Sequence, residues 1–443
     1  MAILTQEEAQ AILKKALGYS TANECELNLN GNVGGNIRYA RNSVSTSGMD
    51  NDTSLVVTSY FGKKSGTATI NEFDDASLQK VVRRSEELAK LAPEDPEYLP
   101  LLGPQTYKTS PAYIETTANI TPDFRADAAM KSIEPAVAKN VQAAGFLQDA
   151  ATFSAMLNSK GLFAYSRQTG VTFSVTMRTT DGTGSGYATS DFNDVSKLDT
   201  AATSQIAIAK ASSSTGAKAI EPGKYTVILE PAALLSNTDA SLLGALFNSM
   251  DARTADEGRS FLSKKGGGNK LGEKMFDERI TVYSDPTHPE VPDATWSGDG
   301  RPQEKITWIE KGVVKNLYSS RYWAENKKIK SIPPPANFIM EGGTETIEDM
   351  IRSTPRGILV TRFWYIRSVD PQTLLYTGLT RDGTFFIENG KIKHPIKNFR
   401  FNESPIIMLN NLEALGKPQR ISGNLVPPMK IRDFTFTSLS DAV

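Results

Sequence analysis

Ser77 and Lys80 are the first residues in the chain whose spacing matches a catalytic pattern. They form Ser-x-x-Lys, the arrangement of one type of serine–lysine nucleophile pair. The segment that carries them is also an amphipathic helix, predicted to open at Asp74, and its polar face would hold both side chains without any chemistry. The companion motifs of such enzymes are absent from the sequence. We therefore interpret this pair as part of a helix surface.

Two glycine clusters raise the question of a phosphate site. One covers residues 182–186 and the other covers residues 266–270. A Walker loop requires Gly-x-x-x-x-Gly-Lys-Ser/Thr between a strand and a helix, and neither cluster supplies it. Because glycine clusters mark turns far more often than ligand sites, we predict a hairpin tip at the first cluster and a surface loop at the second.

Metal ligands are scarce in this sequence. The two histidines, His288 and His394, both lie beside prolines. They lack the helical spacing of a zinc motif, and Cys25, the single cysteine, excludes an internal disulfide and a thiolate cluster. Cys25 alternates with apolar residues in a predicted strand, so we interpret it as a core residue. We expect this chain to hold no metal and no other cofactor.

One segment combines aromatic and basic side chains in a way that suits nucleic-acid binding. It contains Tyr318, Arg321, Tyr322, Trp323, Lys327, Lys328 and Lys330. The whole chain, however, has 49 lysines and arginines against 50 aspartates and glutamates, so its net charge of -1 provides no general attraction for a phosphate backbone. We interpret the segment as a half-buried face and expect no direct nucleic-acid partner.

The elements that position these side chains begin with alternating helices and strands. Residues 1–220 are predicted to form an N-terminal α+β domain. The predicted elements are a helix at about 5–18 with a Thr5–Glu8 capping box, strands at 25–29 and 54–61, a helix from 74, an extended proline-rich segment at 93–111, a helix at 121–144 ended by Gly145, strands at 152–157, 162–166 and 172–178, and a helix at 198–213.

Short strands and turns dominate residues 221–443, which are predicted to form a β-rich C-terminal domain. Its first strand is expected at 224–229, its clearest hairpin turn at Asn389–Gly390, and one buried strand at 357–366. A chain of 443 residues with 39% hydrophobic residues can bury a core in each lobe. The predicted fold class is α+β in two lobes, a mixed helix/strand N-terminal lobe and a strand-rich C-terminal lobe.

The sequence also predicts a cellular compartment. No apolar run approaches the roughly 18 residues that a membrane span requires. The first residues lack the basic and apolar regions of a signal peptide, and one unpaired thiol fits a reducing compartment. We expect a cytoplasmic protein without membrane contact.

Five segments of the C-terminal half occur in an order typical of one known family. They are 224–231, 297–302 (Ser-Gly-Asp-Gly-Arg-Pro), 309–313, 385–396 and 426–434. Together with Asn-Ser-x-Gly at 158–161 and the order of the N-terminal elements, they make the chain resemble the TldD/PmbA family over nearly its whole length. Members of this family are labelled modulators of DNA gyrase or TldD/TldE metalloproteases.

The resemblance implies two kinds of subunit. The TldD kind carries His-Glu-x-x-x-His on a helix after the strand that corresponds to 224–229, and a cysteine near the C-terminus. Together these residues hold zinc and activate water. Counted without gaps, the motif falls here on Asp239, Ala240 and Gly244, and residues 232–250 contain no histidine. The stretch 422–425 contains no cysteine either, so the chain resembles the PmbA/TldE kind, which lacks the zinc motif.

The position of the missing motif predicts the candidate site. Leu242, Leu243, Leu246 and Phe247 indicate an amphipathic helix at 238–250, whose N-terminal polar rim would line a substrate cavity. This rim consists of Asn237, Thr238, Asp239 and Ser241. We expect no catalytic residue in this chain.

The function implied by the resemblance is a non-metal-binding subunit of a cytoplasmic TldD/TldE-type metalloprotease complex that degrades unfolded peptides. Its expected partner is a TldD-like subunit that supplies the zinc, or a second copy of itself when it is alone. The alternative is a binding protein that modulates a target such as DNA gyrase without proteolysis. A third hypothesis is a homo-oligomeric peptidase with a site that the sequence does not reveal.

Overall fold

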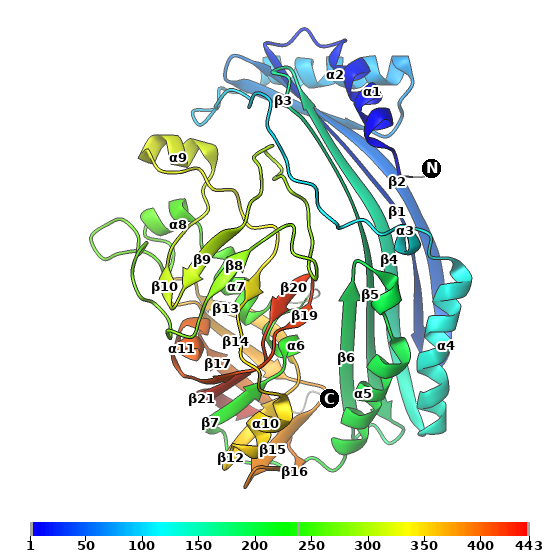
Figure 1. Ribbon diagram of the computed structural model, residues 1–443, viewed down its shortest axis with the longest axis vertical. Coiled ribbons are helices and arrows are strands. Elements are labelled where there is room, and N and C mark those ends of the chain that lie inside the picture. The colour runs from blue at the N-terminus through cyan, green and yellow to red at the C-terminus, as the bar shows by residue number, and fades with distance from the viewer. Residues whose placement is uncertain (1–2, 237–239, 441–443) are drawn as a thin grey trace.

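A six-stranded antiparallel sheet forms the frame of the N-terminal lobe (Figure 1). The computed structural model describes residues 3–236 and 240–440. The sheet has the order β3-β2-β1-β4-β5-β6, and four of its strands have 17 to 19 residues, about three times the usual length. The strands are β1 (Glu24–Ala40), β2 (Ser43–Phe61), β3 (Lys64–Ile70), β4 (Val141–Asn158), β5 (Phe163–Thr179) and β6 (Ser185–Phe192).

The predicted strands of this lobe are confirmed, but they are only the apolar parts of much longer strands. In β2 the predicted portion 54–61 alternates between buried and less buried residues, whereas residues 43–52 are mostly polar and mostly exposed. This polar half carries no hydrophobic alternation and is held in place by continuous pairing with β1. Pairing with a neighbour therefore extends the strand beyond what its own sequence predicts.

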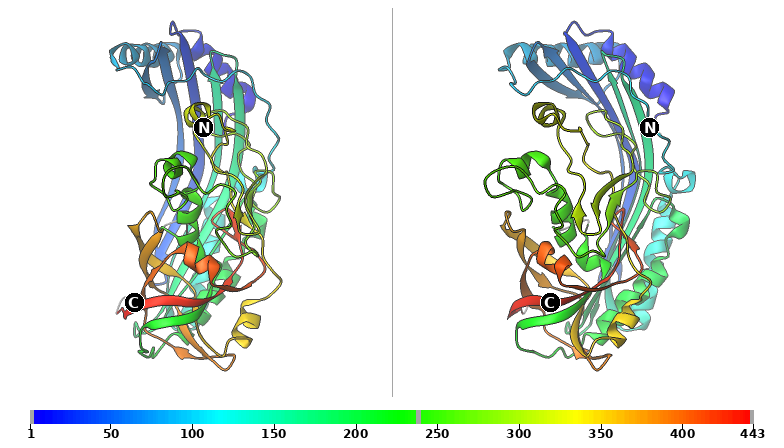
Figure 2. Two further views of the ribbon diagram at one scale, coloured as in Figure 1. Left: turned by 90° about the vertical axis from the view of Figure 1, so that its left-hand side faces the viewer. Right: turned by 60° about the vertical axis from the view of Figure 1, so that its left-hand side comes forward.

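Helices cover the convex face of this sheet, and the C-terminal lobe lies against the concave face (Figure 2). Two helices pack at one end of the sheet and two at the other. They are α1 (Gln6–Leu17) and α2 (Asp75–Leu91), then α4 (Pro122–Ala138) and α5 (Thr200–Ser213), with the short α3 (Glu115–Ala118) and 3₁₀ turn η1 (Val195–Lys197) between them in the chain. The predicted capping box is confirmed, since the Glu8 carboxylate accepts a hydrogen bond from the Thr5 N–H at 2.8 Å.

The prediction of one helix from 121 to 144 is wrong at its end. The helix α4 stops at Ala138, Asn140 has a positive φ of 54°, and β4 begins at Val141. Gly145 is a strand residue and does not end the helix. A Cβ atom there would lie 2.2 Å from the ring of Tyr39, so glycine makes room for this buried tyrosine.

The C-terminal lobe contains two further sheets. The larger has nine strands in the order β13-β14-β17-β21-β7-β12-β15-β16, with β18 paired to β21, and the smaller has the order β10-β9-β8-β11-β20-β19. The strands are β7 (Gly223–Leu229), β8 (Val282–Ser284), β9 (Ile306–Glu310), β10 (Val313–Val314), β11 (Ile339–Met340), β12 (Arg356–Val360), β13 (Phe363–Asp370), β14 (Leu375–Thr380), β15 (Thr384–Glu388), β16 (Lys391–Pro395), β17 (Phe399–Glu403), β18 (Leu412–Leu415), β19 (Gln419–Ile421), β20 (Asn424–Val426) and β21 (Met429–Leu439). The lobe also contains short helices, α6 (Pro231–Leu234), α7 (Leu242–Asn248), α8 (Ala252–Asp256), α9 (Arg321–Lys327), α10 (Ile347–Arg352) and α11 (Pro405–Asn410).

Two local predictions for this lobe have opposite outcomes. The hairpin at Asn389–Gly390 is confirmed, with the positive φ angles of 52° and 75° that such a turn requires. The single buried strand at 357–366 is wrong, because the chain leaves β12 after Val360 and starts β13 at Phe363. Thr361 breaks the strand by donating its hydroxyl to the carbonyls of Asp382 and Gly383.

The α+β fold in two lobes is as predicted. The long sheet ends at Phe192 in the chain, and the sheets of the second lobe begin at Gly223. The exact boundary between residues 220 and 221 stays a prediction.

The proline-rich segment is an extended strap that touches both lobes. Residues 92–114 all belong to the described part and form neither helix nor strand, as predicted. On the N-terminal lobe, the Asn158 amide donates to the Leu102 carbonyl at 2.9 Å. On the C-terminal lobe, the Tyr107 hydroxyl donates to the Gly300 carbonyl at 2.7 Å, and Glu97 pairs with Arg253. The strap therefore fixes the loops of the second lobe against the sheet.

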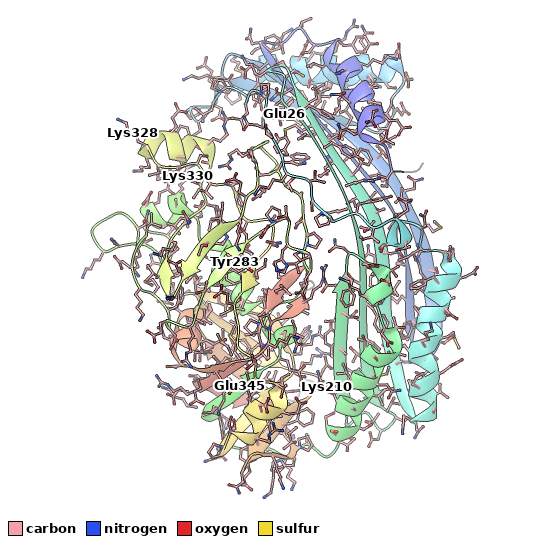
Figure 3. All side chains as sticks on the ribbon, viewed as in Figure 1. Glu26, Lys210, Tyr283, Lys328, Lys330 and Glu345 are labelled. Carbon is pink, nitrogen blue, oxygen red and sulfur yellow. The ribbon has the colours of Figure 1, made fainter. Side chains whose placement is uncertain are left out.

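Charged residues join the lobes at the α5 side of the long sheet. Lys210 on α5 points toward the C-terminal lobe (Figure 3), where its Nζ lies 2.6 Å from the Glu230 carboxylate that precedes α6. Burial raises the pKa of Glu230 even though Lys210 opposes that shift.

Asp191 on β6 joins the two lobes through three hydrogen bonds. Its carboxylate accepts backbone hydrogen bonds from Ser422 at 2.7 Å and Gly423 at 2.9 Å, and one from the Arg420 guanidinium at 2.9 Å. Ser422 and Gly423 form the turn between β19 and β20, and both have positive φ angles. Only 8% of Asp191 is exposed to solvent. Its carboxylate therefore accepts the hydrogen bonds that the turn would otherwise donate to water.

We predict that Asp149→Ala strongly destabilises the N-terminal lobe. Arg125 on α4 and Asp149 on β4 form a bidentate pair at 2.6 and 2.8 Å, with 2% and 5% of their side chains exposed. Removing the carboxylate leaves a buried, unpaired guanidinium, which costs about 3–5 kcal/mol. Urea denaturation measures this loss of unfolding free energy. The control is Asp127→Ala, which removes an exposed ion pair from the same helix, and an equal effect of both variants would contradict the prediction.

We also predict that Asp191→Ala loosens the β19–β20 turn while the rest of the fold stays intact. Without the carboxylate, the backbone N–H groups of Ser422 and Gly423 lose their acceptor. Hydrogen exchange followed by mass spectrometry should show residues 419–426 exchanging about tenfold faster or more. Asp181→Ala, which removes an exposed carboxylate from the neighbouring β5–β6 turn, should leave that exchange unchanged.

Candidate functional site

Helix α7 has one face in the core and one face on a cavity. Leu242, Leu243, Leu246 and Phe247 are at most 1% exposed and belong to the main core of the C-terminal lobe. The opposite face presents Ser241, Gly244, Ala245 and Asn248, which are spaced one helical turn apart. The helix runs only from Leu242 to Asn248, so the predicted helix at 238–250 is too long. Met250 is buried beyond the helix end, where its carbonyl accepts from the Tyr318 N–H.

The cavity beside α7 has a volume of about 520 Å³. Besides the polar face of α7, residues next to this helix in the chain and residues from distant segments enclose it. The neighbouring residues are Leu235, Ser236, Ala240 and Ser249, and the distant ones are Ala336, Phe338, Tyr376, Ser422 and Asn424. The cavity thus combines the start of the C-terminal lobe with its last hairpin.

The wall opposite α7 is held by side-chain hydrogen bonds and ring packing. The Asn424 carboxamide accepts from the Phe338 N–H at 2.7 Å and donates to the Ser422 carbonyl at 2.5 Å. The Phe338 ring stacks on Phe247 with centroids 4.1 Å apart. Since Asp191 holds the backbone of the same hairpin, Ser422 and Asn424 are fixed from two sides.

The predicted site residues fall into two groups. Asn237, Thr238 and Asp239 lie outside the described residues. Ser241 is described, is 7% exposed, and lines the cavity just before α7. A Cβ atom on Gly244 would lie 2.6 Å from the Ser241 hydroxyl oxygen, so the glycine leaves room for this hydroxyl.

Residue spacing did not predict the other half of the cavity. The residues of this half, which are Phe338, Tyr376, Ser422 and Asn424, lie about 100 to 180 residues after Ser241 in the chain. The only earlier signal was the family resemblance, which pointed to residues 422–425 as the region where the zinc-binding kind has a cysteine. The structure brings that region to α7.

The residues around this cavity do not fit zinc. Among the described lining residues, none is His, Cys, Asp or Glu, and the polar groups are hydroxyls and amides. In the rest of the described chain, no group of three such side chains is placed to hold a metal ion. Catalytic zinc requires three protein ligands of these types. Of the three positions on which the zinc motif would fall, Ala240 and Gly244 line the cavity without a side chain that could bind metal, and Asp239 lies outside the described residues.

The other chemical candidates have structural partners. The Ser77 hydroxyl donates to Glu72 at 3.0 Å, while Lys80 is exposed on α2. Cys25 is buried in β1, and this burial raises the pKa of its thiol. His288 accepts from the Glu290 N–H in a turn, and His394 stacks on Phe386 in the β15–β16 hairpin.

Two further predictions concern the glycine clusters and the aromatic and basic segment. The cluster at 182–186 begins in the β5–β6 turn and runs into β6, and the cluster at 266–270 lies in a loop, as predicted.

In the aromatic and basic segment, Trp323 on α9 is half-buried. Its indole N–H donates to Asp256 at 2.9 Å, and the Lys327 ammonium lies above its ring. Lys328 and Lys330 are exposed beside α9 (Figure 3).

No helix within residues 3–236 and 240–440 has both the length and the apolar character needed to cross a membrane.

Comparison with known proteins places this arrangement among related structures. The structure of TldE from Thermococcus kodakarensis matches with a TM-score of 0.86 and 18% identity, covering 97% of this chain and all of the other. A Thermotoga maritima protein, described as a candidate modulator of a DNA gyrase, matches with a TM-score of 0.86 and 16% identity over 97% of this chain and all of its own. These similarities show the fold.

Sequence comparisons identify the family. A metalloprotease of Methanothermobacter thermautotrophicus is 22% identical over 317 residues, which cover 63% of this chain and 64% of that protein. The chain thus spans less than two thirds of that relative's length. Family models match residues 25–89 as PmbA/TldA metallopeptidase domain 1, residues 112–215 as the central domain and residues 222–438 as the C-terminal domain. With most of its length matched in this order, the chain belongs to the PmbA/TldD metallopeptidase family.

Proposed function

We propose that this protein is the non-metal-binding, TldE-like subunit of a TldD/TldE-type metalloprotease complex that degrades unfolded peptides. The observation that carries the proposal is the cavity beside α7. It lies beside the helix that the resemblance matches to the metal helix of the family, and hydroxyl and carboxamide groups line it, among them those of Ser241, Asn248, Ser422 and Asn424. A cavity with this lining suits peptide binding and leaves the metal to another subunit.

The chemistry of the lining supports a peptide ligand. Serine hydroxyls and asparagine carboxamides both donate and accept hydrogen bonds, so they can pair with the N–H and C=O groups of an extended peptide. No charged side chain occurs among the described lining residues, so the cavity does not select for acidic or basic peptides. Phe338 and Tyr376 add apolar surface for side chains of the peptide.

The proposed partner is a TldD-like subunit that holds the zinc, with a homodimer forming when this chain is alone. If both subunits present equivalent faces, a pseudo-twofold arrangement would bring α7 and the metal helix of the partner toward a common chamber. We also place this complex in the cytoplasm, because a single buried cysteine fits a reducing compartment.

The alternative function, modulation of DNA gyrase, draws support from the description of the Thermotoga maritima relative. A net charge of -1 makes direct DNA binding an unfavourable route to that function. Copurification with gyrase in the absence of any peptide cleavage would favour this alternative.

We predict that the purified chain retains far less than one equivalent of zinc after mild chelation. The cavity offers hydroxyl and amide oxygens, which bind zinc weakly compared with imidazole, thiolate or carboxylate. Elemental analysis by mass spectrometry measures the bound metal, and the TldD-like partner treated in the same way serves as the positive control. One equivalent in this chain alone would contradict the proposal.

We further predict that Ala245→Trp lowers peptide cleavage by the reconstituted pair by about tenfold or more, since the indole would fill the cavity and displace the peptide. Ala245 is half-exposed on the cavity face of α7, so the folded state tolerates the larger side chain. The matched control is Ala126→Trp, the same change on an exposed face of α4. Unchanged cleavage by a well-folded Ala245→Trp variant would show that the cavity does not bind substrate.

A further inference from the structure

A second cavity lies where a loop of the C-terminal lobe faces the concave side of the long sheet (Figure 2). Its volume is about 300 Å³, at the lower end of the range for small-molecule sites. The loop contributes Ala294, Trp296 and Gly298, and three adjacent strands of the sheet, β1, β4 and β5, contribute polar side chains. These polar residues are Asn28, Asn30, Thr152, Ser154, Ser166 and Gln168.

The strands place most of these polar side chains in cross-strand rows. Ser154 lies opposite Asn30 on one side and opposite Ser166 on the other, and Thr152 lies opposite Gln168. Neighbouring strands are about 4.8 Å apart, and residues two positions apart on one strand are about 6.8 Å apart. The sheet therefore holds five hydrogen-bonding side chains in a fixed grid of these dimensions.

The side chains of this grid have free hydrogen-bonding groups. None of the five has a hydrogen-bond partner among the residues that the structure describes. Elsewhere on the same sheet, opposite hydroxyls bond to each other, as those of Thr58 and Thr67 do at 3.0 Å. Ser154 and Ser166 are opposite in the same way, yet their hydroxyls do not pair. The donors and acceptors of the grid are therefore available to a ligand.

The strap fixes the loop that covers the grid. The Thr295 hydroxyl donates to the Lys108 carbonyl at 2.7 Å, and the Tyr107 hydroxyl donates to the Gly300 carbonyl at 2.7 Å. Trp296 is 9% exposed and its indole nitrogen is inaccessible, so its side chain can offer only carbon atoms to the cavity. With both walls held in place, a ligand would bind without much further ordering of the protein.

The lining favours an uncharged ligand. Among the described residues that line this cavity, none has a charged side chain, so an ion would lose its hydration without gaining a counter-charge. Hydroxyl groups both donate and accept hydrogen bonds, as do the hydroxyls and, taken as a whole, the carboxamides of the grid. A ligand rich in hydroxyl groups can therefore pair with every position of the grid.

We infer that this cavity binds an uncharged saccharide, a mono- or disaccharide. The hydroxyl groups around a sugar ring would pair with the grid, and the C–H groups of the ring would lie toward Trp296 and Ala294. An extended peptide suits the grid less well, because its polar groups follow one line whereas the grid extends in two directions. The cavity shares no lining residue with the α7 cavity, so the inference does not depend on peptide cleavage.

Isothermal titration of the full-length protein tests the site, with glucose, galactose, mannose and maltose as probes. We expect at least one of these sugars to bind with a dissociation constant of about 1 mM or lower. Because the sugar and the lining are uncharged, the affinity should be the same at low and high salt. An acetylated and amidated trialanine peptide should not displace the sugar, since the proposed peptide site is the α7 cavity.

Two variants locate the binding to this cavity. Gln168→Leu and Asn30→Leu each remove a carboxamide from an exposed position of the grid, where the fold tolerates an apolar side chain of similar size. Each should weaken the bound sugar by about fivefold or more, because hydrogen bonds to the ligand are lost. Gln148→Leu is the matched control, the same change at an exposed position of β4 that does not line the cavity, and should bind as the unchanged protein does.

Three results would overturn the inference. They are the absence of binding by all four sugars, binding that neither Gln168→Leu nor Asn30→Leu weakens, and displacement of the bound sugar by the trialanine peptide.

Discussion

The carboxylate of Asp191 is the contact on which the arrangement of the candidate site depends. It belongs to the last strand of the N-terminal sheet, yet it satisfies the backbone of the β19–β20 turn near the other end of the chain. Ser422 and Gly423 both have positive φ angles in this turn, and the nearly buried Asp191 carboxylate accepts hydrogen bonds from both of their N–H groups. Because Asp191 does so, the hairpin places Ser422 and Asn424 opposite α7. The cavity is therefore a product of both lobes, although its lining belongs to one.

The long sheet can serve both lobes because its strands alternate. Along β1, Leu27 and Leu29 face the helices, while Asn28 and Asn30 line a small polar cavity beneath the C-terminal lobe. Because successive side chains of a strand point to opposite faces, the sheet has an apolar face against the helices and a polar face against the second lobe. A polar contact face allows hydrogen bonds and ion pairs to define how the lobes meet, and the Asp191, Lys210 and strap contacts are of this kind.

Sequence reasoning succeeded where the cause of a structure is local. The Thr5–Glu8 capping box and the Asn389–Gly390 turn depend on residues within a few positions of each other, and both are present. It failed where contacts with residues distant in the chain determine the structure. The break at Thr361 depends on carbonyls about twenty residues away, and the end of α4 depends on the pairing of β4 with β1 and β5. Of the candidate site, the resemblance pointed to α7, to Ser241 and to the region 422–425, whereas Phe338 and Tyr376 reach the cavity through contacts that no single-sequence pattern encodes.

The strap at residues 92–114 has a consequence for the order in which the protein folds as it leaves the ribosome. The strap connects α2 to α3, so it is synthesised early, but its partners Arg253 and Gly300 emerge more than 150 residues later. Until then the strap can rest on the N-terminal sheet alone, through contacts such as that between Asn158 and Leu102. Closing a loop of this length costs conformational entropy, and the contacts that compensate for this cost form only afterwards. The N-terminal lobe can therefore fold with its strap attached on one side only, and docking of the C-terminal lobe then completes the contacts of the strap.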